Sequence, residues 1–339
     1  MNVLVAVPDL FALAGNIHVS LKLADIIKEL GNKVVILYSD IREVNEQYFS
    51  LPQIGEYYPL KNLQASDFEK VSWENYYVEV LARLGLYGDP QYQLFLTNFD
   101  SYAYINEDVD SPQIFYVNWP DRPIGPTGQV WANSKYTQEA IWKRWGVQSK
   151  VVNPPIHLEK YDSSKPFKQR DIAVVGYGQL YLRKGFKVFS SLRARGLKTC
   201  VIGADVKQDK PDVTYLAANS TFNQVTNFLS RSKIFVHAKI GEHFGIAIIE
   251  AMASGCATIC HRSGGPLTDI ILPEEKYGLL FSTEEELGKK VEYLLSDEDI
   301  WKEYSRKAIE GAKRFSYDNV KQEVNGWLKA DFNQNAPTR

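Results

Sequence analysis

The chain alternates short, continuous runs of apolar residues with longer segments in which apolar residues recur every three or four positions. Runs of the first kind predict strands buried on both faces of a parallel sheet, because they lack a polar face. These predicted strands are Asn2–Val7, Lys33–Leu37, Leu94–Thr97, Gln113–Val117, Gly128–Ser134, Val151–Val152, Ile172–Val175, Thr199–Gly203, Ile234–His237 and Ala257–Cys260. Segments of the second kind predict helices at Ile17–Leu30, Ser72–Leu84, Lys135–Trp145, Phe186–Leu192, Ile246–Ser254, Glu284–Leu295, Glu298–Phe315 and Tyr317–Lys329. This alternation predicts α/β domains.

The length of 339 residues predicts two domains, each large enough to bury a core of its own. The polar, proline-containing stretch Asp162–Arg170 predicts a hinge at about residues 155–170. We therefore expect an N-terminal domain over residues 1–158, a second domain over residues 159–315 and a final helix and tail over residues 316–339.

Charge and cysteine content exclude several functional classes. The chain has 39 basic and 41 acidic residues and no basic cluster, which argues against nucleic acid as the main partner. Its three cysteines lack the spacing of a metal site, and they favour a reducing compartment. The sequence enters a strand at once, without the features of a signal peptide, and no window approaches the ~20 apolar residues of a membrane span. We expect a cytoplasmic protein that can still touch a membrane surface.

The most informative stretch runs from Ile234 to Pro266 and reads IFVHAKIGEHFGIAIIEAMASGCATICHRSGGP. Glu250 lies in the middle of a helix that is apolar on nearly every face, so its carboxylate needs a protein partner, a wet cavity or a ligand. Glu242 lies eight residues earlier, and Gly245 leaves the amide groups at the helix start open to an anion. Two carboxylates for hydroxyl groups and a helix start for a phosphate suit a sugar nucleotide. The alternative is that Glu250 pairs with a neighbouring cation and that Glu242 is a solvated loop charge.

This stretch resembles the region of family 4 retaining glycosyltransferases in which two glutamates are separated by seven residues. EHFGIAIIEAMASG and HRSGGP are most similar to the GDP-mannose-dependent mannosyltransferases of the asparagine-linked glycan pathway. The resemblance implies that Glu242 holds hydroxyls of the donor sugar, that Glu250 holds the ribose, and that Phe244, Gly245 and His237 lie at the donor. It also implies the GT-B fold, in which two Rossmann-like domains face a central cleft and the last helix crosses back to the first domain.

Further donor-binding candidates follow the first strand of each predicted domain. Gly15 lies at a strand-to-helix turn, where it either contacts the donor diphosphate or only makes the turn. Lys184 matches the family's phosphate-binding lysine; the alternative is a solvated cation, although the positive end of a helix disfavours one. The family's upstream arginine is replaced here by Gly178 or Gln179, and we expect Arg183 to substitute for it.

Asn118 follows a predicted strand at the position where the resembling family commonly has a histidine beside the reacting sugar. An asparagine side chain can donate and accept hydrogen bonds, but it carries no proton at neutral pH. Asn118 is therefore either a ligand of a sugar hydroxyl or a turn residue before Pro120. Asp108 and Asp110 match a metal-binding DxD pattern, but they fall in an acidic loop, and we expect no metal site.

The expected function is retaining, metal-independent transfer of a hexose, with mannose from GDP-mannose as the first choice and UDP-glucose as its nearest rival. Glu242, Lys184, Arg183 and Asn118 are the predicted catalytic residues. No cofactor is expected, because the nucleotide sugar is a co-substrate. The acceptor is a glycan, a lipid-linked glycan or another hydroxyl compound. The alternatives are a sugar-nucleotide-binding protein with little or no transfer activity and a nucleotide-sugar epimerase on the same fold.

Overall fold

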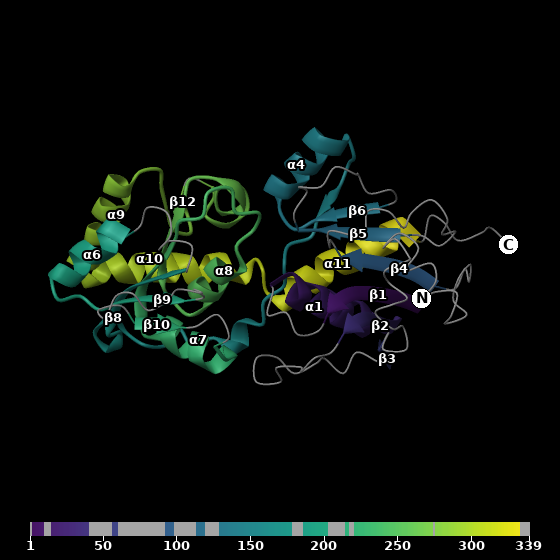
Figure 1. Ribbon diagram of the computed structural model, residues 1–339, viewed down its shortest axis with the longest axis horizontal. Coiled ribbons are helices and arrows are strands. Elements are labelled where there is room, and N and C mark those ends of the chain that lie inside the picture. Colours follow the sequence, from purple (N-terminus) through teal and green to yellow (C-terminus); the bar gives the residue numbers. More distant parts are fainter. Residues whose placement is uncertain are drawn as a thin grey trace. The chain divides into compact units, whose positions relative to one another are not determined.

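A computed structural model describes residues 2–9, 15–40, 56–59, 92–97, 113–118, 129–177, 186–202, 214–216, 220–273 and 275–332. The chain divides into two compact units (Figure 1). Unit 1 comprises Met1–Pro155 together with Val320–Arg339, and unit 2 comprises Ile156–Asn319. The predicted helix at Ser72–Leu84 and the acidic loop at Asp108–Asp110 lie outside the described residues.

Unit 1 is built on a seven-stranded parallel sheet in the order β3-β2-β1-β4-β5-β6-β7. Its strands are β1 (Asn2–Asp9), β2 (Lys33–Asp40), β3 (Glu56–Pro59), β4 (Tyr92–Thr97), β5 (Gln113–Val117), β6 (Gln129–Ala132) and β7 (Lys150–Val151). Its helices are α1 (Gly15–Glu29), α4 (Lys135–Trp145) and most of α11 (Tyr317–Phe332). Gly15 is thus the first residue of α1 rather than part of the preceding loop, and β3 was not predicted.

Helix α4 begins and ends where the sequence predicts. The Ser134 side chain accepts a hydrogen bond from the amide of Thr137, which satisfies one of the free donors at the helix start. Gly146 takes a left-handed conformation, with φ 67°, and its amide donates to the Trp142 carbonyl.

Helix α11 starts beside the hinge and finishes inside unit 1. The Ile156 amide donates to the Phe315 carbonyl (2.8 Å), and the Tyr317 amide donates to the Ile156 carbonyl (2.9 Å). Further along α11, Lys321 pairs with Glu29 of α1 at 2.5 Å. Its apolar side chains Val320, Val324 and Leu328 are buried. The C-terminal helix therefore completes the unit that the N-terminus began, as predicted.

Unit 2 is built on a six-stranded parallel sheet in the order β10-β9-β8-β11-β12-β13. Its strands are β8 (Ile172–Tyr177), β9 (Thr199–Ile202), β10 (Thr214–Leu216), β11 (Ser232–His237), β12 (Ala257–His261) and β13 (Leu279–Phe281). Its helices are α6 (Phe186–Ala194), α7 (Phe222–Ser230), α8 (Ile246–Ala253), α9 (Glu284–Ser296) and α10 (Glu298–Lys313). Short helical turns are η2 (Leu158–Lys160), η3 (Phe167–Gln169) and the π-helix η4 (Pro266–Ile270).

Each face of this sheet has its own core layer. Ile234 and Val236 of β11 pack with side chains of α6 and α9, whereas Phe235 packs with α8 and α10. Alternate side chains of a strand point to opposite faces, so a strand covered on both sides must be apolar throughout. The strand order reverses between β8 and β11: β9 and β10 are added on one side of β8, and β11, β12 and β13 on the other. At this point Gly176 of β8 pairs with Val236 of β11. Ligands of open α/β sheets bind at the carboxyl ends of strands at such a point.

Within the residues that the structure describes, no helix is long and apolar enough to cross a membrane.

Candidate active site

The loop between β11 and α8 leaves the sheet at this reversal point and carries Glu242. Gly245 is the N-cap of α8, with φ 103°, and no side chain caps the helix. A methyl group at Gly245 would lie 2.6 Å from Ile248 Cδ1 and 3.4 Å from Glu242 Cγ. Only glycine takes this conformation without strain, and its small size lets Glu242 lie against the helix start. The loop therefore brings a carboxylate to the positive end of α8.

Glu242 is held by three neighbouring groups. Its Oε1 accepts a hydrogen bond from the amide of His243 at 3.0 Å. Its Oε2 lies 3.2 Å from Lys239 Nζ and 3.5 Å from His237 Nε2. The Glu242 side chain is 15% exposed, so it is sheltered by the protein but still reaches the surface of the unit. The structure thus brings together three predicted site residues, His237, Glu242 and Gly245, and adds Lys239.

Burial and charge set the protonation of this group at neutral pH. Burial lowers the pKa of His237 to about 4, against the attraction of Glu242, so the imidazole is neutral. Burial raises the pKa of Glu242, but His237, Lys239 and the hydrogen bonds to the carboxylate together bring it below its ordinary value. Because the imidazole is neutral at pH 7, the charge that favours the carboxylate is that of Lys239.

The glycine pair of the HRSGGP motif fixes the backbone of this loop. A methyl group at Gly264 would lie 2.2 Å from the Glu242 carbonyl oxygen, and one at Gly265 would lie 2.5 Å from that of His243. The Gly265 amide donates to the Glu242 carbonyl at 2.7 Å. The motif is therefore a backbone clamp on the residues around Glu242, a role that requires glycine.

A serine extends the clamp to the other end of the loop. The Gly241 amide donates to Ser263 Oγ at 2.9 Å, and Ser263 Oγ lies 2.8 Å from His261 Nδ1. Ser263 follows β12, so the loop after β11 is anchored on the neighbouring strand. These contacts leave the Glu242 backbone little freedom.

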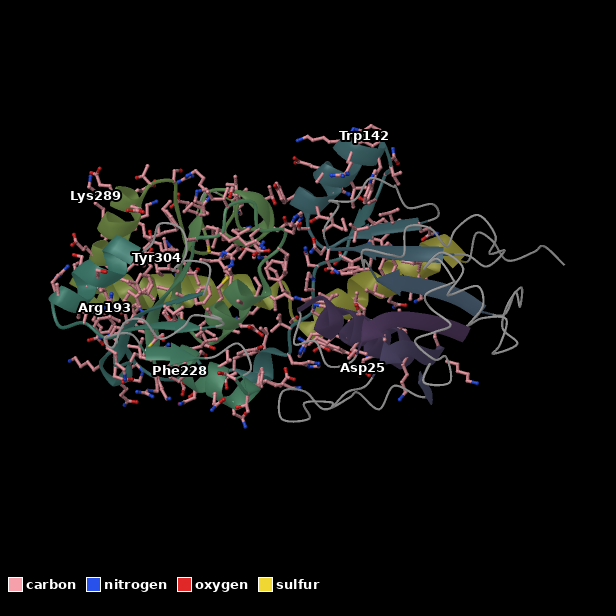
Figure 2. The ribbon with its side chains drawn as sticks, in the orientation of Figure 1. Asp25, Trp142, Arg193, Phe228, Lys289 and Tyr304 are labelled. Atoms are coloured by element: carbon pink, nitrogen blue, oxygen red, sulfur yellow. The ribbon has the colours of Figure 1, made fainter. Side chains whose placement is uncertain are left out.

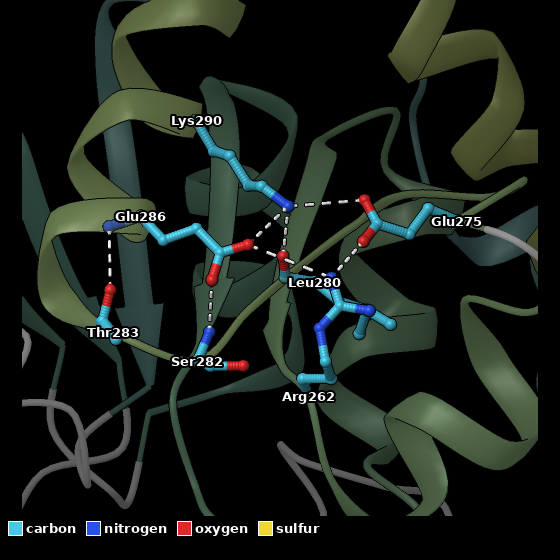
Figure 3. Close-up of polar contacts among 7 residues, drawn as sticks. All are labelled: Arg262, Glu275, Leu280, Ser282, Thr283, Glu286 and Lys290. Atoms are coloured by element: carbon cyan, nitrogen blue, oxygen red, sulfur yellow. Dashed lines mark hydrogen bonds and ion pairs between the residues drawn. The ribbon is translucent and has the colours of Figure 1, made fainter.

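A cluster of charges anchors the clamp itself (Figure 3). Arg262, next to Ser263, pairs with Glu275 at 2.5 Å and approaches Glu286 at 3.9 Å. Lys290 bridges the same two carboxylates, at 3.4 Å from Glu275 and 3.1 Å from Glu286. The Arg262 amide also donates to the Phe281 carbonyl at 2.8 Å. A network in which each cation faces two anions restrains its members more than isolated surface pairs do.

Glu250 has a protein partner that the sequence does not indicate. Its Oε1 accepts a hydrogen bond from the hydroxyl group of Tyr161 at 3.0 Å. Tyr161 follows η2 in the segment that opens unit 2, 89 residues before Glu250. The carboxylate in the apolar helix thus accepts a hydrogen bond from a neutral donor.

Phe244 is a packing residue rather than a ligand contact through its side chain. The ring is 2% exposed and meets Phe315 edge to face, with ring centroids 5.3 Å apart. The prediction of a donor contact can hold only for its backbone, because the side chain faces the core.

Asn118 and Gly15 belong to unit 1: Asn118 directly follows β5, and Gly15 is the first residue of α1. Asn118 is 4% exposed, and Asn133 Nδ2 lies 3.4 Å from both its Oδ1 and its carbonyl oxygen. Among the described residues the Asn118 Nδ2 group has no hydrogen-bond partner. Lys184 and Arg183 fall between β8 and α6, outside the described ranges, as do Gly178 and Gln179.

Two contributors to this site were not predicted. Lys239 carries a local signal, since it precedes Glu242 by three residues in the same loop. Tyr161 carries none, because only folding brings it to Glu250. Over the described part of the chain, no three histidine, cysteine or acidic side chains are grouped so that they could hold a metal ion.

Comparison with known proteins identifies the segment that carries this site. Residues 159–315 match the family described as glycosyl transferases group 1. The matched residues all lie within unit 2, which is therefore similar to a group 1 glycosyltransferase domain. The match contains the β11–α8 loop, the clamp and both glutamates.

Among characterised relatives, the chain is 28% identical over 202 residues to the GDP-Man:Man(3)GlcNAc(2)-PP-Dol alpha-1,2-mannosyltransferase of Mus musculus. That alignment covers 49% of this chain and 41% of the mouse protein, so the chain matches less than half of the relative's length.

Solved glycosyltransferase structures match nearly the whole chain. The sucrose-phosphate synthase of Thermosynechococcus elongatus has a TM-score of 0.76 at 16% identity, covering 98% of this chain and 100% of that one. HepE of Anabaena, solved in complex with UDP and glucose, has a TM-score of 0.72 at 15% identity, covering 97% and 100%. The chain has the GT-B fold, as predicted.

Proposed function

We propose that this protein is a retaining glycosyltransferase of family 4 that transfers a hexose from a nucleotide-diphosphate sugar to a hydroxyl acceptor without a metal ion or other cofactor. The observation that carries the proposal is the arrangement of Glu242. A group 1 glycosyltransferase domain holds this carboxylate at the uncapped start of α8, between a backbone clamp and a lysine. Glu250 lies on the same helix, with its carboxylate oriented by Tyr161.

The reaction needs charge stabilised on a leaving diphosphate while the anomeric carbon becomes cation-like. Fixed donors aimed at developing charge supply the largest catalytic contribution in many enzymes. The start of α8 offers such donors, and Lys184 and Arg183 are the proposed cations beside it. Glu242 orients the donor sugar and Glu250 the ribose. In such a scheme the leaving phosphate accepts the acceptor's proton, so Asn118 needs only to bind a sugar hydroxyl.

We propose GDP-mannose as the donor and a glycan, including a lipid-linked one, as the acceptor. The mouse relative named as a GDP-mannose-dependent, dolichol-linked mannosyltransferase supports both choices. UDP-glucose is the rival donor. It is included in the test because the structure of Anabaena HepE contains UDP and glucose.

We also propose that the protein acts in the cytoplasm and touches a membrane surface through α4. The three cysteines are free thiols and buried, which suits a reducing compartment. Trp142 on α4 is 57% exposed (Figure 2), and the exposed cations Lys143 and Arg144 follow it in the helix. An aromatic ring flanked by cations suits an interface with anionic lipids, and co-sedimentation with anionic vesicles tests this.

The function is tested by incubating the protein with GDP-mannose or UDP-glucose and measuring release of the nucleoside diphosphate, with water or a glycan as acceptor. Release that Glu242→Gln abolishes, without loss of nucleotide binding, supports a transferase. Binding without release supports an inactive sugar-nucleotide-binding protein, and conversion of the sugar without acceptor supports an epimerase. The anomeric signal of the first product in proton NMR reports retention, and an unchanged rate in EDTA supports a metal-independent reaction.

A further inference from the structure

Lys239 is a cation in the donor-site loop that the resemblance to family 4 does not account for. It lies two residues after the end of β11, and its side chain is 31% exposed. Its Nζ is 3.2 Å from Glu242 Oε2. The clamp formed by Ser263, Gly264 and Gly265 fixes the backbone around Glu242, but a fixed backbone alone leaves the carboxylate free to rotate.

The contacts of the two Glu242 oxygens are unequal. A carboxylate has about four acceptor positions, two on each oxygen. Oε2 faces two side chains, those of Lys239 and His237, whereas Oε1 holds the amide of its own neighbour His243. Within the described residues, Oε1 is therefore the oxygen with room for a hydroxyl group of a bound sugar.

Among the described residues, Lys239 supplies the positive charge next to Glu242 Oε2 at pH 7. In this part of the chain, the titratable groups around Glu242 include His237 from β11, Lys239 from the loop, and His261 from β12, which reaches the loop through Ser263 and the Gly241 amide. Burial keeps the pKa of His237 at about 4, so its imidazole adds no charge at pH 7. Within the described part of the chain, the ammonium group in direct contact with Glu242 is that of Lys239.

We propose that Lys239 is the positioning residue of Glu242: its ammonium group holds the carboxylate ionised and fixes Oε2, so that Oε1 accepts the donor-sugar hydroxyl. This inference rests on the proposed function, because it names how the same carboxylate is presented to the donor.

The test compares Lys239→Met, which removes the charge, with Lys239→Arg, which keeps it. The matched control is Lys289→Met on α9, where an exposed lysine pairs with Glu285 at 2.6 Å (Figure 2). Two quantities are measured: the pH dependence of kcat/KM for hydrolysis of GDP-mannose, and the titration of the Glu242 carboxyl carbon in the free protein by NMR. Glu242→Gln assigns the carboxyl signal.

We expect Lys239→Met to lower kcat/KM at pH 7 by roughly tenfold to a hundredfold, the loss that follows a small misplacement of a reacting group. The acid limb of its pH profile, where kcat/KM falls toward low pH, moves to higher pH, because a carboxylate without its cation ionises less readily. Lys239→Arg restores most of the activity and the wild-type limb, and Lys289→Met behaves as wild type. The Glu242 carboxyl titration moves in the same direction as the acid limb.

An acid limb of Lys239→Met that coincides with that of the wild type overturns the inference, whatever its carboxyl titration does. A Lys239→Arg variant as impaired as Lys239→Met also overturns it. If the wild-type protein releases no nucleoside diphosphate from either nucleotide sugar, with water or with a glycan as acceptor, the proposed function fails. The carboxyl titration still tests the role of Lys239 separately, because it needs no activity: an unmoved Glu242 signal in Lys239→Met refutes that role.

Discussion

Substitution of Gly264 by alanine tests whether the clamp positions Glu242. Gly264 has φ +67°, and an added methyl group would lie 2.2 Å from the Glu242 carbonyl oxygen and 2.8 Å from its amide nitrogen. Gly196 in the same unit has φ +77°, and Gly146 in unit 1 has φ +67°; neither has an atom within 4 Å of an added methyl group. Alanine at these two control positions meets only the backbone penalty, of about 1–2 kcal/mol.

The difference between Gly264→Ala and the controls isolates the collision with the Glu242 backbone. Because the oxygen cannot move without breaking the bond from the Gly265 amide, the loop must shift by about 1 Å to reach ordinary contact distance. Overpacking of this kind costs about 1–3 kcal/mol beyond the controls. A displacement of about 1 Å at a reacting group lowers the rate roughly a hundredfold.

The assay is urea unfolding of the three variants and the wild type, followed by circular dichroism, with kcat/KM for donor hydrolysis measured on the same samples. The slopes with denaturant should agree, so that shifts of the midpoint report stability. Gly264→Ala should be the least stable and should alone lose activity. If it matches Gly196→Ala in both stability and activity, the close approach at Gly264 does not position Glu242.

Three further outcomes are expected. Tyr161→Phe removes the hydroxyl donor of Glu250 and should weaken GDP binding roughly threefold to tenfold by calorimetry, as for loss of one hydrogen bond; unchanged affinity would deny Tyr161 a positioning role. Between pH 6.5 and 4, His237 takes up a proton in the unfolded state but stays neutral in the folded state, because burial lowers its pKa to about 4. The free energy of unfolding should therefore fall by up to roughly 3 kcal/mol as the pH drops. Urea titrations at each pH should show a shallower fall for His237→Gln. Arg170→Met should cost about 3–5 kcal/mol in thermal unfolding, because the buried guanidinium donates to four backbone carbonyls, whereas exposed Arg195→Met should change stability by less than about 0.5 kcal/mol.

The apolar pattern of the sequence predicts most of the described strands and helices because a strand covered on both faces, such as β11, is apolar throughout. It misses β3, β10 and β13, which are short, and α7, whose capping box of Thr221 and Gln224 was not recognised. It also misses the π-helix at Pro266–Ile270, because hydrophobic spacing does not distinguish a π-helix from an ordinary turn of helix.

In the candidate site, a contact between residues close in sequence is predictable, whereas a contact between distant residues is not. The pairing of Glu242 with Lys239 lies within one loop and is readable from spacing. The contact between Tyr161 and Glu250 joins residues 89 positions apart and depends on the sheet order. Phe244 shows a limit of motif reading: its place in the motif predicts a donor contact, and burial of its ring against Phe315 leaves only the backbone for that contact.

The passage of α11 from unit 2 into unit 1 constrains how the protein can be made. Unit 2 is one continuous segment, so a growing chain can close its core while the ribosome is still adding the last residues. Unit 1 cannot complete its core until the end of synthesis, because Val320, Val324 and Leu328 are synthesised after the rest of the unit. A fragment that stops at Pro155 would expose the apolar surface that these side chains cover, and a premature stop near the end of the gene would damage the half of the molecule that was translated first.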